Sequence, residues 1–111
     1  MESIKMRVVL LIVTMALCTA ARAGYSQDSG RITQLFMSTE GAVAVTLDVG
    51  FANAIATRQC PVNDGYWAGI IAADPLFKAV LLSAKSKGST VVITTEGCEG
   101  NWFKIIDIYV K

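Results

Sequence analysis

Hydrophobic and polar residues alternate along much of the chain after residue 30, in the period-two pattern of β-strands. Residues 31–38, RITQLFMS, form one such run, and the turn at Glu40-Gly41 separates it from AVAVTLDVGF at 42–51. The two runs predict an antiparallel hairpin with one buried face. The second run would bury Val43, Val45, Leu47 and Val49 and turn Ala44, Thr46 and Asp48 outward.

Two further segments break this regular pattern. Residues 24–30, GYSQDSG, are polar and rich in turn formers, which predicts a loose N-terminal arm. Residues 54–71 predict a short strand around Ile55 and another from Tyr66 to Ile71, joined by a loop that contains Pro61 and Gly65.

A helix is predicted over residues 75–87, where apolar residues recur at helical spacing. Asp74 and Pro75 fit the N-cap and first helical positions, and Gly88 fits the stop. We expect the apolar stripe to pack on the core rather than to form a groove for a partner. The stripe consists of Leu76, Phe77, Val80, Leu81 and Ala84.

The chain closes with two β-branched runs, STVVITTE at 89–96 and NWFKIIDIYVK at 101–111, joined by a turn at 97–100. In the last run Ile106, Ile108 and Val110 would face the core, and Asp107, Tyr109 and Lys111 would face outward. The order strand, strand, strand, helix, strand, strand predicts a mainly β fold with one helix. We expect a small five-stranded antiparallel OB-type barrel, with an open α+β sheet as the alternative.

Residues 1–23, MESIKMRVVLLIVTMALCTAARA, have the three-part layout of a secretory signal peptide. Lys5 and Arg7 precede an apolar run from Val8 to Leu17, and small residues lead to Ala23, where cleavage is expected. The run is shorter than the roughly 20 residues that span a bilayer, which argues against a transmembrane anchor. We therefore expect a periplasmic or secreted protein with no membrane anchor after cleavage.

Cleavage would leave residues 24–111, a chain of 88 residues that suits one small domain. This part holds seven basic and eight acidic residues, a net charge of −1. It lacks the basic excess of a nucleic-acid-binding domain. A domain of this size buries only about 60 to 70% of its unfolded surface, so it needs a further source of stability.

Cys60 and Cys98 are the two cysteines of this expected domain, because Cys18 lies in the signal peptide. In an exported protein they predict one intramolecular disulfide. The bond would close a loop of 39 residues and stabilise the fold by about 4 kcal/mol in the chain-entropy model. A zinc site would need more ligands and a nucleophilic cysteine an imidazole base, but the chain has no His.

The remaining residues give no sign of catalysis. The serines have no histidine to activate them, and no glycine-rich phosphate loop is present in the sequence. The acidic residues of the expected domain fall in predicted turns, caps or outward strand positions, where solvated charges are usual. We therefore expect a protein that is not an enzyme and uses no metal or cofactor. These acidic residues are Asp28, Glu40, Asp48, Asp64, Asp74, Glu96, Glu99 and Asp107.

Several stretches of the chain carry a resemblance to known proteins: GRITQLF with VAVTLD, the segment YWAG at 66–69, AKSKG followed by STVVITTEGC, and the closing KIIDIYV. Together they resemble small exported bacterial proteins and, more distantly, the B subunit of subtilase-type AB5 toxins. The resemblance implies an OB fold, a homopentameric ring and binding of sialylated sugars. It also implies sugar contacts near Asp28 and Ser29, just ahead of the first predicted strand.

Aromatic residues supply the other candidates for binding. Tyr66, Trp67 and Trp102 could stack on a sugar or a protein partner, but for Trp67 and Trp102 packing in or over the barrel is the favoured interpretation. We expect an exported binding module for a glycan or for an envelope or host protein, with a homo-oligomer as one state. The alternatives are a periplasmic or secreted accessory protein and a small inhibitor of hydrolases, with the loop from Pro61 to Tyr66 as the inserted segment.

Overall fold

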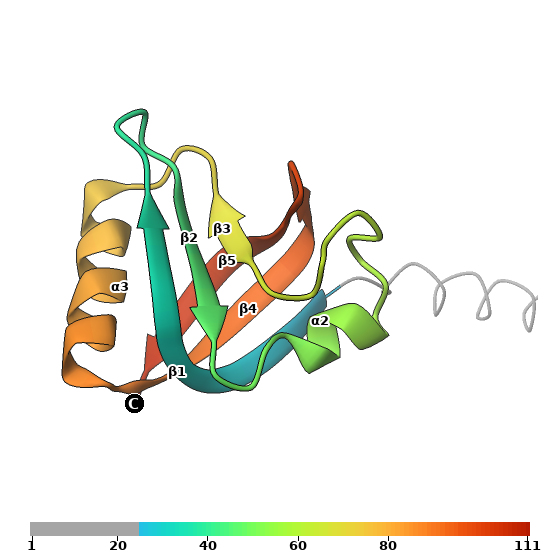
Figure 1. Cartoon of the computed structure of the whole chain (residues 1–111), viewed down its shortest axis with the longest axis horizontal. Coiled ribbons are helices and arrows are strands. Elements are labelled where there is room, and N and C mark those ends of the chain that lie inside the picture. The colour runs from blue at the N-terminus through green and yellow to red at the C-terminus, as the bar shows by residue number, and fades with distance from the viewer. Residues whose placement is uncertain (1–24) are drawn as a thin grey trace, which may run out of the picture.

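The computed structural model describes residues 25–111, and the expected signal peptide at 1–23 with its cleavage site lies outside them. This part of the chain is mainly β, as the alternating pattern predicts, and holds five strands and two helices (Figure 1). The strands are β1 (Tyr25–Met37), β2 (Val43–Leu47), β3 (Ala68–Ile70), β4 (Thr90–Glu99) and β5 (Trp102–Val110). The helices are α2 (Ala52–Ala56) and α3 (Pro75–Lys87).

The five strands form one mixed sheet whose pairings return to the strand where they begin. The order is β1-β2-β3-β5-β4, and β4 pairs again with β1. The long strand β1 makes this possible, because residues 25–31 pair with β4 and residues 32–37 pair with β2. Four of the pairings are antiparallel, but β3 and β5 run parallel. The expected antiparallel sheet is therefore wrong at this one pair.

The expectation of a loose arm at residues 24–30 is wrong, because the first half of β1 begins at Tyr25. Ser26 and Asp28 point inward and are buried, with exposed fractions of 8% and 5%, while Tyr25 and Gln27 point outward. The sequence here lacks the apolar–polar alternation that predicts a strand, because the residues that point inward are polar. Their partners lie elsewhere in the chain, and Ser26 Oγ lies 3.4 Å from Thr95 Oγ1 on β4.

The short strand expected around Ile55 is instead the helix α2. Phe51, at its N-cap position, makes no side-chain capping bond. Asp28 of β1 takes that role, because its Oδ1 accepts a hydrogen bond from Asn53 N at 2.9 Å and its Oδ2 one from Ala54 N at 3.2 Å. A cap from a distant strand leaves no local signal, and five helical residues are too few to show a period.

The helix α3 is confirmed at both ends. Asp74 accepts a hydrogen bond from Leu76 N at 2.8 Å, and Gly88 ends the helix with a φ of 64°, a conformation that favours glycine. Figure 1 shows α3 beside the sheet, and Leu81 and Ala84 on it are fully or nearly buried. The expected burial of the apolar stripe is wrong at Leu76, which is 73% exposed because it lies in the first turn.

The predicted strand faces need two corrections. All of β2 is buried, so both of its faces are covered, whereas Val49 lies beyond the end of β2 and is exposed. In β5 the register shifts opposite Thr94 and Thr95, so Ile105 and Ile108 face the core although they are three residues apart. The extra residue turns Ile106 outward. Val110, at the strand end, is also exposed.

The hydrophobic core lies inside the closed sheet and continues to α3 on one side and to Phe51 before α2 on the other. Phe51 and Phe103 meet there with ring centroids 5.9 Å apart. The other core residues come from all five strands, the two helices and Cys60. They are Ile32, Val43, Val45, Leu47, Ala54, Cys60, Ala68, Leu81, Ala84, Val91, Ile93 and Ile105.

Two neighbouring leucines on α3 provide a matched test of this core. Leu81 has no exposed surface, while Leu82 is 52% exposed. We expect Leu81→Ala to lower the free energy of unfolding by about 2 to 5 kcal/mol, because it leaves a cavity. Leu82→Ala should change it by less than about 0.5 kcal/mol. Urea unfolding of the two variants measures both values, and equal losses would contradict the packing of α3.

Candidate ligand-binding surface

Trp67 and Trp102 lie side by side on the outer face of the parallel strands β3 and β5. Ala68 and Phe103 are register partners that face the core, so the residues directly before them point outward. A hydrogen bond from Phe103 N to Trp67 O, at 3.1 Å, holds the two strands together at this point. Both tryptophans are half-buried. The parallel register therefore brings together two residues that are far apart in the sequence.

The two indole side chains line a hollow of about 160 Å³ together with Val62, Asp64 and Asn101. The hollow combines aromatic surface, a carboxylate and an amide. Asp64 Oδ1 already accepts a hydrogen bond from Tyr66 N at 3.0 Å, which shapes the turn around it. A carboxylate has room for about four hydrogen bonds, so this turn leaves most of its accepting capacity for a ligand.

Small residues on the neighbouring strands bring Trp102 close to the sheet. Ala44 on β2 and Gly69 on β3 are register partners on the outer face, next to Phe36 on β1. A Cβ atom on Gly69 would lie 2.6 Å from Cε3 of Trp102, so only glycine leaves room for this ring. Phe36 meets Trp102 edge to face, with ring centroids 5.8 Å apart. Aromatic surface thus extends from the hollow across to β1.

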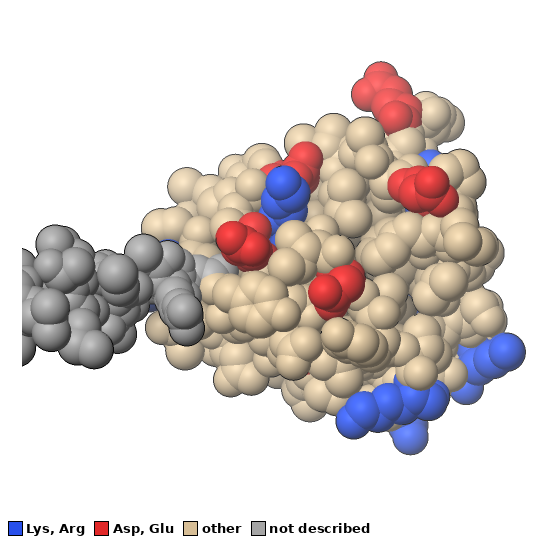
Figure 2. All heavy atoms as spheres, turned by 180° about the vertical axis from the view of Figure 1, so that it is seen from behind, with Lys and Arg blue, Asp and Glu red and all other residues tan. Residues whose placement is uncertain are grey.

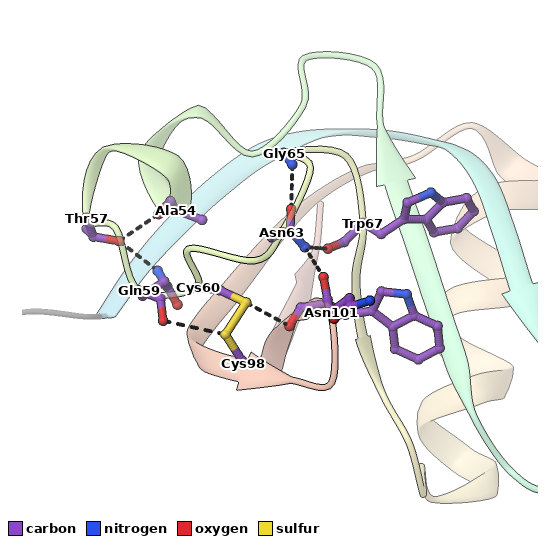
Figure 3. Close-up of a disulfide and its surroundings, with 10 residues drawn as sticks. Ala54, Thr57, Gln59, Cys60, Asn63, Gly65, Trp67, Cys98 and Asn101 are labelled. Carbon is purple, nitrogen blue, oxygen red and sulfur yellow. Dashed lines mark hydrogen bonds between the residues drawn. A yellow bond between two sulfur atoms is a disulfide. The ribbon is translucent and has the colours of Figure 1, made fainter.

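Asn63 holds the loop that carries Asp64 and Trp67. Its Nδ2 donates to Trp67 O at 2.8 Å and to Asn101 O at 2.7 Å, and its Oδ1 accepts from Gly65 N. Figure 3 shows Asn63 between these three residues. One amide side chain therefore ties the 57–67 loop to the turn between β4 and β5, the two segments that form the hollow.

A disulfide joins Cys60 to Cys98, as the cysteine count predicts, and lies beside Asn63 and its hydrogen-bond partners (Figure 3). Their Cα atoms are 5.1 Å apart, within the usual range for such a bond. The Cys60 sulfur also lies 3.6 Å from Trp102 O, and the Cys98 sulfur 3.8 Å from Gln59 O. These are contacts rather than hydrogen bonds, because bonded sulfurs carry no proton. The bond fixes the 57–67 loop on β4.

The other candidate residues from the sequence lie outside the hollow. Tyr66 is next to Trp67 in the chain and 64% exposed, but it does not line the hollow. Ser29 is exposed on β1 opposite Val92 of β4. Asp28 is buried and caps α2, so both of its carboxylate oxygens have partners in the protein. The structure brings together only the two tryptophans among the five proposed binding residues.

Three residues of this surface have no distinctive sequence signal. Asp64 and Asn101 resemble ordinary turn residues, and Phe36 is one apolar residue in an alternating strand. Their contribution depends on the loop at 57–67, the turn between β4 and β5 and the end of β1 meeting at one end of the sheet. The sequence offers one signal for the site, which is that both tryptophans lie within two residues of a polar turn segment.

Across residues 25–111, no group of three or more His, Cys, Asp and Glu side chains is arranged to hold a metal ion. The same part of the chain contains no helix with the length and apolar character needed to cross a membrane. No protein-family model matches the chain, and no curated protein or solved structure does so either. The comparisons therefore identify no family for this chain.

Asp28 can be tested as a structural residue. We expect Asp28→Ala to lower the free energy of unfolding by about 1 to 3 kcal/mol, because the amides of Asn53 and Ala54 lose their acceptors. The control is Ser29→Ala, which changes an exposed neighbour and should cost less than about 0.5 kcal/mol. Chemical denaturation gives both values. Unchanged stability with loss of ligand binding would instead support the sugar contact that the toxin resemblance implies.

The disulfide should contribute much of the stability of this small fold. We expect the double variant Cys60→Ala/Cys98→Ala to lose about 4 kcal/mol, because the unfolded chain regains the freedom of a long closed loop. A reductant should lower the urea midpoint of the wild type and leave that of the double variant unchanged. Free thiols in the native protein, detected by mass spectrometry, would contradict this expectation.

Proposed function

We propose that the chain is an exported, non-enzymatic carbohydrate-binding module with an OB-type barrel. The observation that carries this proposal is the hollow lined by Trp67, Trp102, Asp64 and Asn101. The resemblance to toxin B subunits also favours glycan binding, but the sialylated sugars that it implies are anionic, and the carboxylate of Asp64 in the hollow would repel them.

The sheet topology supports the OB-type assignment. The order β1-β2-β3-β5-β4 closes on β1, and a helix connects β3 to β4. OB folds bind oligosaccharides and oligonucleotides on the outer face of strands 2 and 3, next to the loops between strands 1 and 2 and between strands 4 and 5. Asn101 lies in the second of these connections, and Phe36 lies near the first. The aromatic surface therefore borders the two loops next to which OB folds bind their ligands, although its rings come from β1, β5 and the residue before β3.

The chemistry of the hollow suits a sugar. The flat face of an indole packs against the C–H face of a pyranose, which has both apolar and polar sides. The carboxylate of Asp64 accepts hydrogen bonds from hydroxyl groups, and the amide of Asn101 both donates and accepts them. Stacking with a few placed polar groups is the pattern of small-molecule sites.

The charge of the hollow argues against a nucleic acid. Among the five residues described as lining it, Asp64 is charged and no lysine or arginine is present. Binding of a phosphate backbone depends mainly on cationic side chains, and a carboxylate beside the stacking rings would repel it. An uncharged or amine-bearing sugar fits this surface better than a phosphate-bearing ligand.

The size of the hollow sets the expected affinity. About 160 Å³ is less than the roughly 300 Å³ at which typical ligand pockets begin. A single site should therefore bind one or two sugar units weakly. Useful binding would then come from several copies acting together, which fits a homo-oligomer.

The test is a glycan array probed with the protein displayed in several copies, followed by titration of any sugar that binds. We expect Trp67→Ala to lower the affinity at least tenfold, which corresponds to about 1.4 kcal/mol. Tyr109→Ala is the matched control, because Tyr109 is an exposed aromatic residue on β5 outside the hollow. It should leave the affinity unchanged.

A second variant separates binding from folding. Asn101→Ala keeps the main-chain carbonyl that accepts from Asn63 and removes only the side chain at the hollow. We expect it to weaken binding with little change in the unfolding midpoint. Absence of any glycan hit in the multivalent array, or an equal loss in Tyr109→Ala, would refute the proposal.

A further inference from the structure

Four cationic residues lie together at the end of the sheet where β4 begins. Arg31 is the register partner of Thr90, and Lys111 N donates to Thr90 O at 2.9 Å from the other side. Lys85 and Lys87 are in the last turn of α3, which ends at Gly88 just before β4. We call Arg31, Lys85, Lys87 and Lys111 the basic end. It holds four of the seven lysines and arginines among residues 25–111.

The basic end differs in charge from the rest of the surface. Figure 2 shows most of the visible lysine and arginine atoms at one lower corner of this face, while the acidic side chains lie elsewhere on it, with a further cation among them. All four cations are exposed. One acidic residue, Asp48, is close by, and its Oδ1 accepts from Arg31 N at 2.9 Å. The four positive charges still outnumber it.

Exposed valines accompany these charges. Val49 is 63% exposed and lies so close to Gly30 that a Cβ there would be 2.9 Å from its Cγ2. Val110, next to Lys111, is 48% exposed. Cations with small apolar residues near them suit the headgroup region of an anionic bilayer, where lipid phosphates meet the first carbons of the acyl chains. A soluble polyanion would make no use of the valines.

We propose that the basic end docks on the anionic lipid headgroups of a bilayer. The strand β4 runs from Thr90 at the basic end to Glu99, whose register partner is Trp102. Ten residues of strand span roughly 30 Å. Docking therefore turns the hollow with Trp67 and Trp102 away from the membrane. This distance exceeds the Debye length of about 8 Å at physiological salt, so acidic residues at the far end do not oppose docking. The inference does not depend on sugar binding.

The experiment is co-sedimentation with vesicles, using the protein in the form in which it is purified from the cells that express it. Vesicles of phosphatidylglycerol and phosphatidylcholine are compared with vesicles of phosphatidylcholine alone, which measure any binding by apolar segments. We expect binding to the anionic vesicles only, and its loss at high salt. The variant Lys85→Glu/Lys87→Glu should lower the partition coefficient at least about 25-fold, because each cation near such a surface contributes roughly fivefold.

The matched control has the same net charge but keeps the basic end. Lys78→Glu/Lys104→Glu changes a first-turn residue of α3 and a residue of β5 near Glu99. We expect its binding to stay within about twofold of the wild type, because charges this far from the membrane are screened. Equal losses in both double variants, equal binding to neutral vesicles, or no binding to anionic vesicles would overturn the proposal. Retention on heparin without vesicle binding would also overturn it and would assign the basic end to a soluble polyanion.

Discussion

A sheet of five strands that closes on itself cannot be antiparallel throughout. Strand direction alternates around an antiparallel ring, and an odd number of strands forces one neighbouring pair to run the same way. In this protein that pair is β3 and β5. Closure buries the inner faces of all the strands around one core, so the parallel pair is a necessary part of the fold.

The same parallel pair creates the candidate binding surface. In register, it points Trp67 and Trp102 out of the sheet next to each other. Gly69 allows one indole to lie against the strands, and Asn63 and the disulfide hold the loop that brings Asp64 to the hollow. The loop at this end is thus held by hydrogen bonds and a covalent bond. Such preorganisation lowers the entropy that a surface loses when it binds a ligand.

The polar interior at the start of β1 shows how a small fold places hydrogen-bonding groups inside. Ser26 and Asp28 occupy inward strand positions, where Thr95 and the first amides of α2 satisfy them. A buried carboxylate is tolerated here because it accepts two main-chain hydrogen bonds. The first half of β1 therefore needs no apolar residues at its inward positions, and it still closes the sheet through its pairing with β4.

Local chemistry in the sequence determined the features that depend on neighbouring residues. The helix α3 with Asp74 and Gly88 at its ends, the β1–β2 hairpin and the β4–β5 hairpin follow from caps, turn residues and alternation. The disulfide followed from having two cysteines and one way to pair them. The tertiary structure alone decided the rest. The cap of α2 comes from a strand 25 residues earlier, the shift in β5 depends on its pairing with β4, and the two tryptophans meet only through a parallel pair separated by 35 residues of chain. These contacts are made between segments that no local pattern links, and they form because the sheet has to close to bury its apolar face.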